Sequence, residues 1–512
     1  MQILPHLKTI SLSILILILL DSCSAGSDTQ PQPNNNLATL TRLSTNGTNF
    51  VDPNNQFIYL RGVNMMSKTP TDLLTLGFNQ ANVNLMKTSN FTVVRLGVMW
   101  AYVEPTPNQY NEQYLNQIAS IIKMLAAQGI YTIIDFHEDE YSSIFGDGAP
   151  GWAAILPNEA TSSPDYGFPA NLFCDGEANS ESGLNCRTDI NYAYASFWSN
   201  ASYQGVGLQQ YYINMVQHVV TQFQYLQGDI VGYDLVNEPY LGINFKNCVT
   251  QVYPLQTKAC PEFDQTLGTF YDTLITAIRQ IDQNTIIFYE PNLLFGLGQY
   301  SDPIISVPDK KLVFSFHNYD TNDLATVYQN AIVIGKKRNV QIMLTEFGGD
   351  ISESTIESSI EIINKDSLSY TYWTYFNNPT YKFTSGSGLP ANPALQGIVY
   401  DLANPLNPTN VNYNVLSDLN TLYIFKSNNI NFSSVIKNND GSYDLYYNTI
   451  STVKSSIILN VATGCTYNIF DDHGNLLTSE INQNTETITL DNIAATHLKA
   501  LPTTDCPLTM QP

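Results

Sequence analysis

Residues 230–239 read IVGYDLVNEP, a short apolar run that ends in an asparagine and a glutamate. The run is short, apolar and bounded by turn residues, so it predicts a buried parallel strand. Residues 341–348, QIMLTEFG, have the same form and also end in a glutamate. In parallel α/β folds the carboxyl ends of the strands carry the functional side chains. The two stretches therefore predict a parallel sheet with Glu238 and Glu346 at one edge.

Further apolar runs of similar length lie on both sides of these two, and segments with helical periodicity separate them. Tyr114–Ala127, Tyr211–Phe223 and Phe270–Ile281 each place their apolar residues on one face, as amphipathic helices do. Strands that alternate with helices in this way predict an α/β fold, specifically a (β/α)8 TIM barrel. The expected strands are Phe57–Val63, Thr92–Val98, Tyr131–His137, Ile230–Asn237, Thr285–Glu290, Leu312–His317, Gln341–Phe347 and Tyr370–Tyr375.

The pattern changes near residues 405–408, which read PLNP. Beyond them Ser442–Tyr447 and Ser456–Val461 alternate with a period of two, and turn signals punctuate the sequence. This pattern predicts a C-terminal antiparallel β-sandwich domain. We therefore expect a signal peptide at 1–25, a polar linker at 26–45, the catalytic barrel at 46–405 and the sandwich at 406–512.

The N-terminus carries an apolar run, Ile10–Leu20, followed by small residues that end at Ala25. The run is too short to span a bilayer, so it predicts a secretory signal peptide cleaved near Ala25. The mature chain is then expected to be secreted, lumenal or lysosomal. A lipoprotein anchor at Cys23 is the rival interpretation, and Asp21 fits it poorly.

Cysteine and sequon usage agrees with secretion. Removal of the signal peptide leaves six cysteines, and these allow 15 connectivities. Proximity alone suggests three local couples: Cys174 with Cys186, Cys248 with Cys260, and Cys465 with Cys506. Four sequons offer glycan sites in a eukaryotic source: Asn46, Asn90, Asn200 and Asn431.

The charge balance excludes several kinds of partner. The chain has 22 Lys and Arg against 45 Asp and Glu, a formal charge of −23. No basic stripe offsets this, so nucleic-acid binding is excluded and docking on anionic membranes is disfavoured. The sequence has no cluster with zinc-site spacing, so neither a metal nor a cofactor is expected. With 32 Tyr and only 13% charged residues, its surface suits neutral, hydroxyl-rich ligands.

Two carboxylates across the mouth of a barrel form the pair that glycoside hydrolysis needs. One must stay protonated to donate to the leaving oxygen, and the other must be ionised to attack the anomeric carbon. Asn237-Glu238-Pro239 and Thr345-Glu346-Phe347-Gly348 supply that pair on the fourth and seventh expected strands.

Over about residues 56–380 the chain resembles glycoside hydrolase family five, whose active site uses eight residue types. Every type has a match at an expected strand end: Arg95, His137, Asn237, Glu238, His317, Tyr319, Glu346 and Trp373. The resemblance implies that Glu238 is the acid/base, with a pKa raised by an apolar site and by Glu346. It implies that Glu346 is the nucleophile, kept ionised by Arg95 and by a hydrogen bond from Tyr319.

The remaining roles also follow from the resemblance. Asn237 is expected to bind the sugar 2-hydroxyl, and Trp373 to form a stacking floor beneath the ring. His137 and His317 are expected to bind other hydroxyls or to orient Glu238. Asp139 and Lys68 are separate candidates for sugar-hydroxyl contacts. Asp135 is expected to face away from the mouth or to orient a neighbour.

Within the family, residues 137–142 (HEDEYS), 146–153 (GDGAPGWA) and 61–64 (RGVN) are similar to the endoglycoceramidases. This branch hydrolyses the β-glycosidic bond between the oligosaccharide and the ceramide of glycosphingolipids. Glu138 is a departure, because the branch more often has Gln there. The long connection 138–229 is expected to help hold the lipid through its aromatic residues, namely Phe145, Trp152, Phe168, Phe173, Phe197 and Trp198.

The predicted protein is therefore a secreted, retaining endoglycoceramidase, a monomer whose partner is its glycosphingolipid substrate. Three alternatives stay open at this point. The same fold also serves endo-β-1,4-glucanases and β-glucosidases acting on glucosylceramide or steryl glucosides. A catalytically inactive glycolipid-binding protein is the non-enzyme alternative, and the intact pair Glu238/Glu346 argues against it.

Overall fold

The structure is a computed structural model. It describes residues 40–158, 172, 188–242, 248–251, 256–257, 259–320, 323–349, 353–376, 397–428, 430–438, 440–449, 455–461, 465–477, 480–482, 487–493 and 497–503. The expected signal peptide, Phe168, Phe173, Cys174, Cys186 and Cys506 lie outside the described residues.

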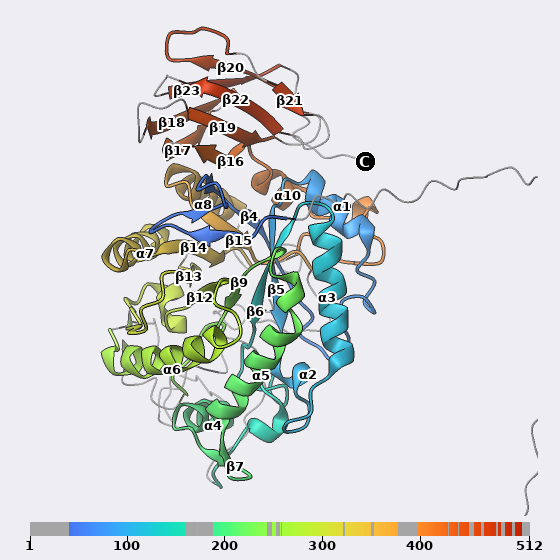
Figure 1. Cartoon of the computed structure of the whole chain (residues 1–512), viewed down its shortest axis with the longest axis vertical. Helices are drawn as coiled ribbons and strands as arrows, with labels where there is room; N and C mark the ends of the chain where they lie inside the picture. Colours follow the sequence, from blue (N-terminus) through green and yellow to red (C-terminus); the bar gives the residue numbers. More distant parts are fainter. Residues whose placement is uncertain are drawn as a thin grey trace, which may run out of the picture. The chain divides into compact units, whose positions relative to one another are not determined.

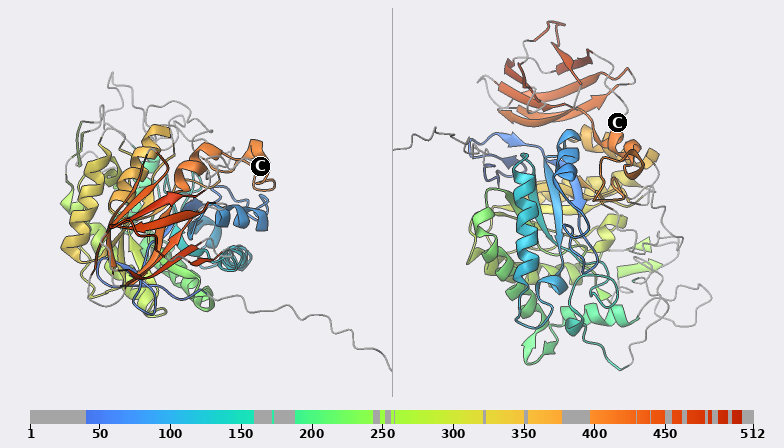
Figure 2. Two further views of the ribbon diagram at one scale, coloured as in Figure 1. Left: turned by 90° about the horizontal axis from the view of Figure 1, so that it is seen from above. Right: turned by 90° about the vertical axis from the view of Figure 1, so that its right-hand side faces the viewer.

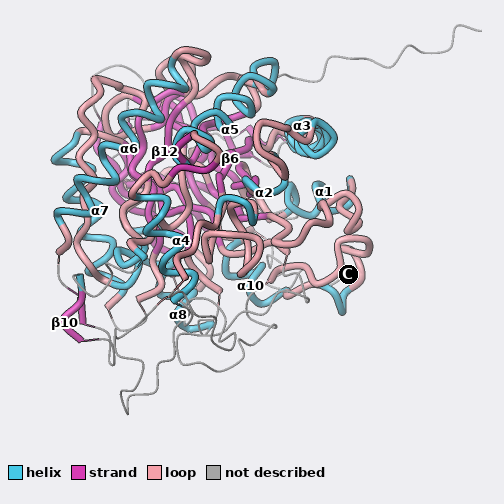
Figure 3. Tube along the Cα trace, turned by 90° about the horizontal axis from the view of Figure 1, so that it is seen from below, coloured by secondary structure: helices cyan, strands magenta, loops and turns pink. Residues whose placement is uncertain are grey.

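A closed parallel barrel occupies the centre of the catalytic region (Figures 1 and 3). The strands follow chain order around the barrel, and their backbone positions are buried throughout because helices cover the outside and side chains fill the inside. The prediction of a TIM barrel is thus confirmed. Its strands are β4 (Arg61–Met65), β5 (Val93–Val98), β6 (Tyr131–Phe136), β9 (Ile230–Asp234), β12 (Ile286–Tyr289), β13 (Leu312–His317), β14 (Gln341–Glu346) and β15 (Ser369–Tyr372).

The three amphipathic helices expected from periodicity are present, with somewhat different ends. In α3, for example, Asn111 accepts the Tyr114 N–H as an N-cap and Ile118, Ile122 and Leu125 are buried. The helices are α1 (Gln80–Thr88), α2 (Trp100–Val103), α3 (Glu112–Ala126), α4 (Thr188–Trp198), α5 (Leu208–Gln222), α6 (Pro261–Arg279), α7 (Leu324–Arg338), α8 (Glu353–Lys365) and α10 (Tyr413–Leu419). Short 3-10 helices lie at Gly151–Ala153, Gln224–Leu226, Leu293–Leu297 and Pro408–Asn410.

The first expected strand, Phe57–Val63, was wrong as a single element. Phe57–Ile58 is β3, which pairs with the C-terminal strand β16 (Tyr423–Asn428), whereas the barrel strand β4 begins at Arg61. Between them the backbone changes partners, because Tyr59 N–H donates to the Phe425 carbonyl and Leu60 N–H to Ser369. Both sheets bury this apolar run, so its composition could not reveal the break.

The C-terminal region forms two antiparallel sheets, whose strands from β16 onward are drawn in orange to red in Figures 1 and 2. One has the order β1-β2-β3-β16-β19-β22-β21 and the other β17-β18-β23-β20. Alternate residues such as Ile457, Leu459 and Ile469 are buried between them, as the period-two pattern predicts. The strands are β1 (Ser44–Thr45), β2 (Phe50–Val51), β17 (Ile430–Lys437), β18 (Tyr443–Thr449), β19 (Ser455–Asn460), β20 (Tyr467–Asp471), β21 (Glu480–Asn482), β22 (Thr487–Ile493) and β23 (His497–Pro502). Two small antiparallel pairs complete the strands of the described residues: β7 (Ser202–Tyr203) with β8 (Val206–Gly207), and β10 (Val249–Gln251) with β11 (Gln256–Thr257).

The pairing of the strands does not follow the domain boundary expected at residue 406. Residues 44–58 precede the barrel but extend the C-terminal sheet through β3. Arg61, buried at the start of β4, donates to Thr421 and to Asn364 at 3.0 and 2.6 Å. Its guanidinium also lies 4.3 Å from the centre of the Tyr423 ring, a cation–π contact. The first barrel strand is therefore joined to Thr421 and Tyr423 through the Arg61 side chain.

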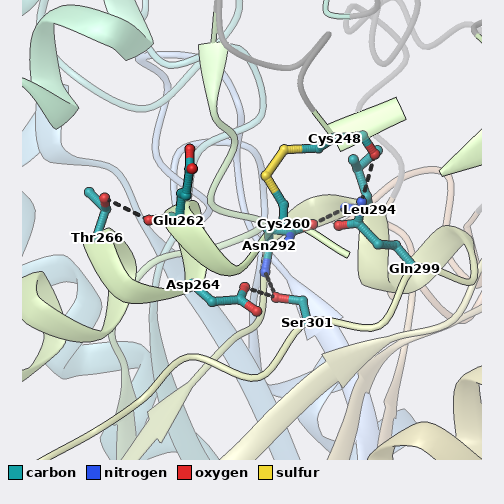
Figure 4. The surroundings of a disulfide bond; sticks show 9 residues. All are labelled: Cys248, Cys260, Glu262, Asp264, Thr266, Asn292, Leu294, Gln299 and Ser301. Atoms are coloured by element: carbon teal, nitrogen blue, oxygen red, sulfur yellow. Dashed lines mark hydrogen bonds between the residues drawn. A yellow bond between two sulfur atoms is a disulfide. The ribbon is translucent and has the colours of Figure 1, made fainter. Parts of the chain in front are cut away.

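One of the three expected disulfides is present among the described residues. Cys248 and Cys260 are bonded, with their Cα atoms 5.2 Å apart, at the start of α6 (Figure 4). Nearby, Asp264 accepts a hydrogen bond from Ser301, and Gln299 donates to the Cys248 carbonyl. Cys465 is disulfide-bonded as well. No helix in the described ranges is both long and apolar enough to cross a bilayer.

Candidate active site

Arg95 on β5 lies at the centre of the barrel mouth and is fully buried. Its guanidinium donates to carboxylates on other barrel strands, at 2.7 Å to Glu346 and 2.9 Å to Asp135. Burial lowers the pKa of Arg95, but the surrounding carboxylates outweigh it and raise the pKa well above its usual value. The remaining acceptors are Asn64 at 3.1 Å, Asp234 at 3.0 Å, Asn237 at 3.0 Å and Glu290 at 2.9 Å.

Glu346, the last residue of β14, has the two contacts expected of it. Arg95 Nη1 lies 2.7 Å from Oε1, and the Tyr319 hydroxyl donates to Oε2 at 2.9 Å. Burial nevertheless raises the pKa of Glu346 above its usual value, and the cations His317 and Arg95 offset only part of that shift. Two hydrogen-bond donors thus hold Glu346 in place, while burial disfavours the ionised form of its carboxyl group.

Glu238 follows β9 and faces Glu346 across the mouth. His317 Nδ1 lies 2.7 Å from Glu238 Oε1 and 3.4 Å from Glu346 Oε2. One oxygen of each carboxylate and one nitrogen of His317 lie within 4.8 Å of one another. Retaining glycosidases place their two carboxyl groups about 5–5.5 Å apart, whereas inverting enzymes leave room for a water. The pair therefore has the retaining geometry.

His317, on β13, lies among carboxylates that favour its protonated form. Burial lowers its pKa, but Glu290 and Glu346 outweigh burial, so the pKa of His317 is raised well above its usual value. His137 behaves in the opposite way, because burial and then Lys68 hold its pKa well below the usual value. Its Nδ1 lies 2.8 Å from Asp135, which orients the neutral ring.

One side of the mouth is built from an aromatic ring and an ion pair. The ring of Trp373 stacks on His137, with 5.5 Å between centroids and 12° between planes. Lys68 Nζ lies 4.6 Å from the centre of the Trp373 ring and pairs with Asp139. Asp139 N–H is in turn held by Asp147 at 2.9 Å. The expected contact residues thus lie together beside the carboxylate pair.

Asn237 is fixed at both ends of its amide. Its oxygen accepts from Arg95, and its Nδ2 donates to the Glu138 carbonyl at 2.8 Å. Since an amide nitrogen carries two hydrogens, the second remains for a sugar hydroxyl. The orientation is therefore set by the protein before any substrate arrives.

Two groups of side chains have ligand types that could hold a metal: His137, Asp139 and Asp147, and Glu238, His317 and Glu346. In the first group the Lys68 ammonium already pairs with Asp139 and lies 3.7 Å from Asp147. In the second, His317 lies between the two carboxylates, which raise its pKa. Each set thus already contains or contacts a basic side chain of the protein.

Sequence reasoning missed Asn64, Asp234 and Glu290 as parts of the site, and it left the role of Asp135 open. Asp135 faces inward and bridges Arg95 to His137, so it does orient a neighbour. The position of Arg95 within an expected barrel strand could have indicated them, because an arginine inside a barrel requires buried carboxylates as counter-charges.

Most of the described aromatic residues of the long connection brace it against the barrel. Trp152 makes an edge contact with Trp100 at 5.6 Å and donates its N–H to the Glu104 carbonyl. Trp198 donates to the Tyr240 carbonyl at 2.6 Å, and the Phe197 ring packs against it. These residues are packing elements, and this part of the expected lipid wall is not supported by their positions. Phe145 is half-buried against the same core.

The cellulase family model, glycosyl hydrolase family 5, matches residues 51–379. The chain belongs to glycosyl hydrolase family 5. Membership agrees with the barrel and with the placement of the carboxylate pair after β9 and β14, and it makes the chain a glycoside hydrolase.

Named relatives of this family 5 member include two endoglycoceramidases. Endoglycoceramidase I of Rhodococcus hoagii is 23% identical over 365 residues, covering 66% of this chain and 68% of that protein. The endoglycoceramidase of Cyanea nozakii is 25% identical over 323 residues, covering 60% and 62%. The solved endo-glycoceramidase II of Rhodococcus sp., a lactosyl-enzyme intermediate, has a TM-score of 0.65 at 19% identity and covers 89% of this chain and all of its own. That likeness extends the shared fold into the C-terminal sheets.

Proposed function

We propose that the protein is a retaining endoglycoceramidase that hydrolyses the β-glycosidic bond between the oligosaccharide and the ceramide of glycosphingolipids. The observation that carries the reaction type is the pair Glu238/Glu346, whose oxygens lie within 4.8 Å. Similarity to curated endoglycoceramidases over most of the barrel supports the substrate class.

In the first step Glu346 attacks the anomeric carbon and Glu238 donates its proton to the leaving ceramide oxygen. The products of this step are the free ceramide alcohol and a covalent glycosyl-enzyme ester. In the second step Glu238, now ionised, takes a proton from water, which displaces Glu346 and releases the oligosaccharide. Arg95 and Tyr319 hold the carboxylate of Glu346 in both steps.

The side of the mouth formed by Trp373, His137, Lys68 and Asp139 supplies the sugar subsite in this proposal. The ring of Trp373 offers an apolar face for the sugar, and Lys68 and Asp139 offer a donor and an acceptor for its hydroxyls. The Asn237 amide is aimed at the 2-hydroxyl, where contacts strengthen in the oxocarbenium-like transition state.

Secretion and glycosylation belong to the same proposal, as the N-terminal apolar run and the sequons suggest. Asn46 and Asn200 are exposed, so both can accept a glycan. Asn90 is only 6% exposed and its Nδ2 donates to Asn420 at 3.1 Å, which disfavours a glycan there. N-terminal sequencing and glycopeptide mapping of the secreted protein test these points.

The decisive experiment is mass spectrometry of the products from a defined ganglioside. Release of the intact oligosaccharide together with free ceramide supports the proposal. Parallel assays on cellulose oligomers and on a monoglucosyl lipid test the endoglucanase and glucosidase alternatives. Turnover of the cellulose oligomers or of the monoglucosyl lipid without cleavage of the ganglioside would refute the endoglycoceramidase assignment. The Glu346→Gln variant serves as the negative control.

A further inference from the structure

Glu290 follows the fifth barrel strand, β12, and is 2% exposed. Its carboxylate contacts three groups of the active site. Oε1 lies 2.9 Å from Arg95 Nη2 and 3.2 Å from His317 Nε2. Oε2 accepts the backbone N–H of Glu238 at 2.9 Å. A substrate at the carboxylate pair would be separated from Glu290 by these groups, so Glu290 acts through them.

The backbone of Glu238 gives the third contact its importance. Its φ is +41°, in the left-handed region that residues other than glycine rarely adopt. The next residue is Pro239, which also restricts the residue before it. An uncommon backbone at a catalytic residue persists only when its surroundings hold it. Glu290 provides that restraint by accepting the N–H of the very peptide that carries the Glu238 side chain.

The contact of Glu290 with His317 acts on the Glu238 side chain at its carboxyl end. His317 stands between the two carboxylates, with Nε2 toward Glu290 and Nδ1 2.7 Å from Glu238 Oε1. Glu290 is the first of the charges that raise the pKa of His317. Because Nε2 pairs with Glu290 while Nδ1 lies against Glu238, the tilt of the imidazole ring depends on the ion pair with Glu290.

We propose that Glu290 is a positioning residue for general acid catalysis, which holds Glu238 through its peptide N–H and through His317. The proposal rests on the proposed glycosidase mechanism, in which Glu238 protonates the leaving oxygen. Glu290 is surrounded by Arg95, Asp234, His317 and Glu346, and the barrel arginine keeps its other carboxylate partners when Glu290 is changed.

The test separates acid catalysis from general damage by varying the leaving group. Glu290→Gln keeps the shape but offers one acceptor oxygen to three donors. A dinitrophenyl glycoside leaves without protonation, so its kcat/KM should fall by less than about 3-fold, whereas an alkyl glycoside of the same sugar needs the acid. General acid catalysis contributes about 10²–10⁴-fold, so a loss of roughly 30-fold or more is expected for the alkyl substrate.

A matched control is Asp282→Asn, which changes a buried carboxylate near the opposite end of β12. Asp282 accepts the Asn284 and Thr285 N–H groups at 2.8 and 3.0 Å, far along the strand from the site. Its variant should affect the two substrates equally. If Glu290→Gln does not fold by circular dichroism, Glu290→Asp, which keeps the charge on a shorter side chain, carries the same comparison.

Equal losses for both leaving groups in the Glu290 variant, or no loss in either, would overturn the inference. A wild-type enzyme that cleaves the aryl glycoside but not a ganglioside would refute the proposed lipid substrate and leave this inference standing. A wild-type enzyme inactive on every glycoside would refute the proposed function, and the inference with it.

Discussion

Glu138 offers a test of how burial acts on a carboxyl group beside the active site. Glu138 is one of the residues that line a mainly apolar cavity of about 40 Å³, together with rings such as Trp100 and Phe197. Burial raises the pKa of Glu138 well above its usual value, although hydrogen bonds from Tyr194 and from the Tyr141 N–H oppose the shift. Those bonds, at 2.5 and 2.8 Å, both end on Oε2.

The sign of the effect on stability follows from linkage. The pKa of Glu138 is higher in the folded protein than its unfolded value of about 4.3. The free energy of unfolding is therefore highest below about pH 4.3 and decreases as the pH rises above it. The loss amounts to about 1.4 kcal/mol per pH unit until the folded pKa is reached. Glu138→Gln keeps an oxygen for Tyr194 and Tyr141 but cannot ionise, so it should escape this loss.

The assay is a series of thermal melts of wild type and Glu138→Gln between pH 4 and pH 7. The melting temperature of the variant should rise relative to wild type as the pH increases. In a chain of this size the shift is roughly 2 °C or less per kcal/mol. Glu262→Gln, at an exposed position on α6, is the control and should show no trend. A difference between Glu138→Gln and wild type that stays constant across this range would refute the reasoning.

Other consequences of the site and the scaffold can be checked directly. Glu238→Gln should still form the covalent intermediate from a dinitrophenyl glycoside, and azide should rescue its second step because azide needs no general base. Azide should not rescue Glu346→Gln, and equal behaviour of the two variants would contradict the assigned roles. Proton NMR early in turnover should reveal the β-anomer first, and an early α-product would exclude retention. Cys248→Ser should lower the free energy of unfolding by about 3 kcal/mol, since the disulfide to Cys260 closes a loop with a sequence separation of 12; unchanged denaturant midpoints would argue against that value.

The barrel could be predicted from the sequence because each of its strands is a short apolar run that two layers bury. The same property hid the break after Ile58, where one apolar run serves two sheets. Carboxylates at strand ends could be assigned once Glu238 and Glu346 were considered together. Those within the barrel mouth, such as Asp234, could not, because their role depends on which way a strand residue points relative to Arg95.

The disulfides illustrate a different limit. Proximity in the sequence was sufficient for Cys248 and Cys260, because a short connection keeps the two sulfurs near each other whatever the fold. The sequon at Asn90 is intact, but its side chain is buried and donates to Asn420. Whether the asparagine of a sequon is accessible depends on how the chain packs around it, and the local sequence motif does not show this.

The pairing of β3 with β16 means that the catalytic barrel has no clean C-terminal end at which the polypeptide could be shortened. A chain that stops before Thr421 would strip the Arg61 guanidinium of a hydrogen bond and of the Tyr423 ring while leaving its charge within the protein. Buried donors that lose their partners cost about 1–3 kcal/mol, and more when charged. Removal of the C-terminal sheets is thus expected to lower the stability of the barrel itself, and a shortened chain should melt at a lower temperature than the full chain.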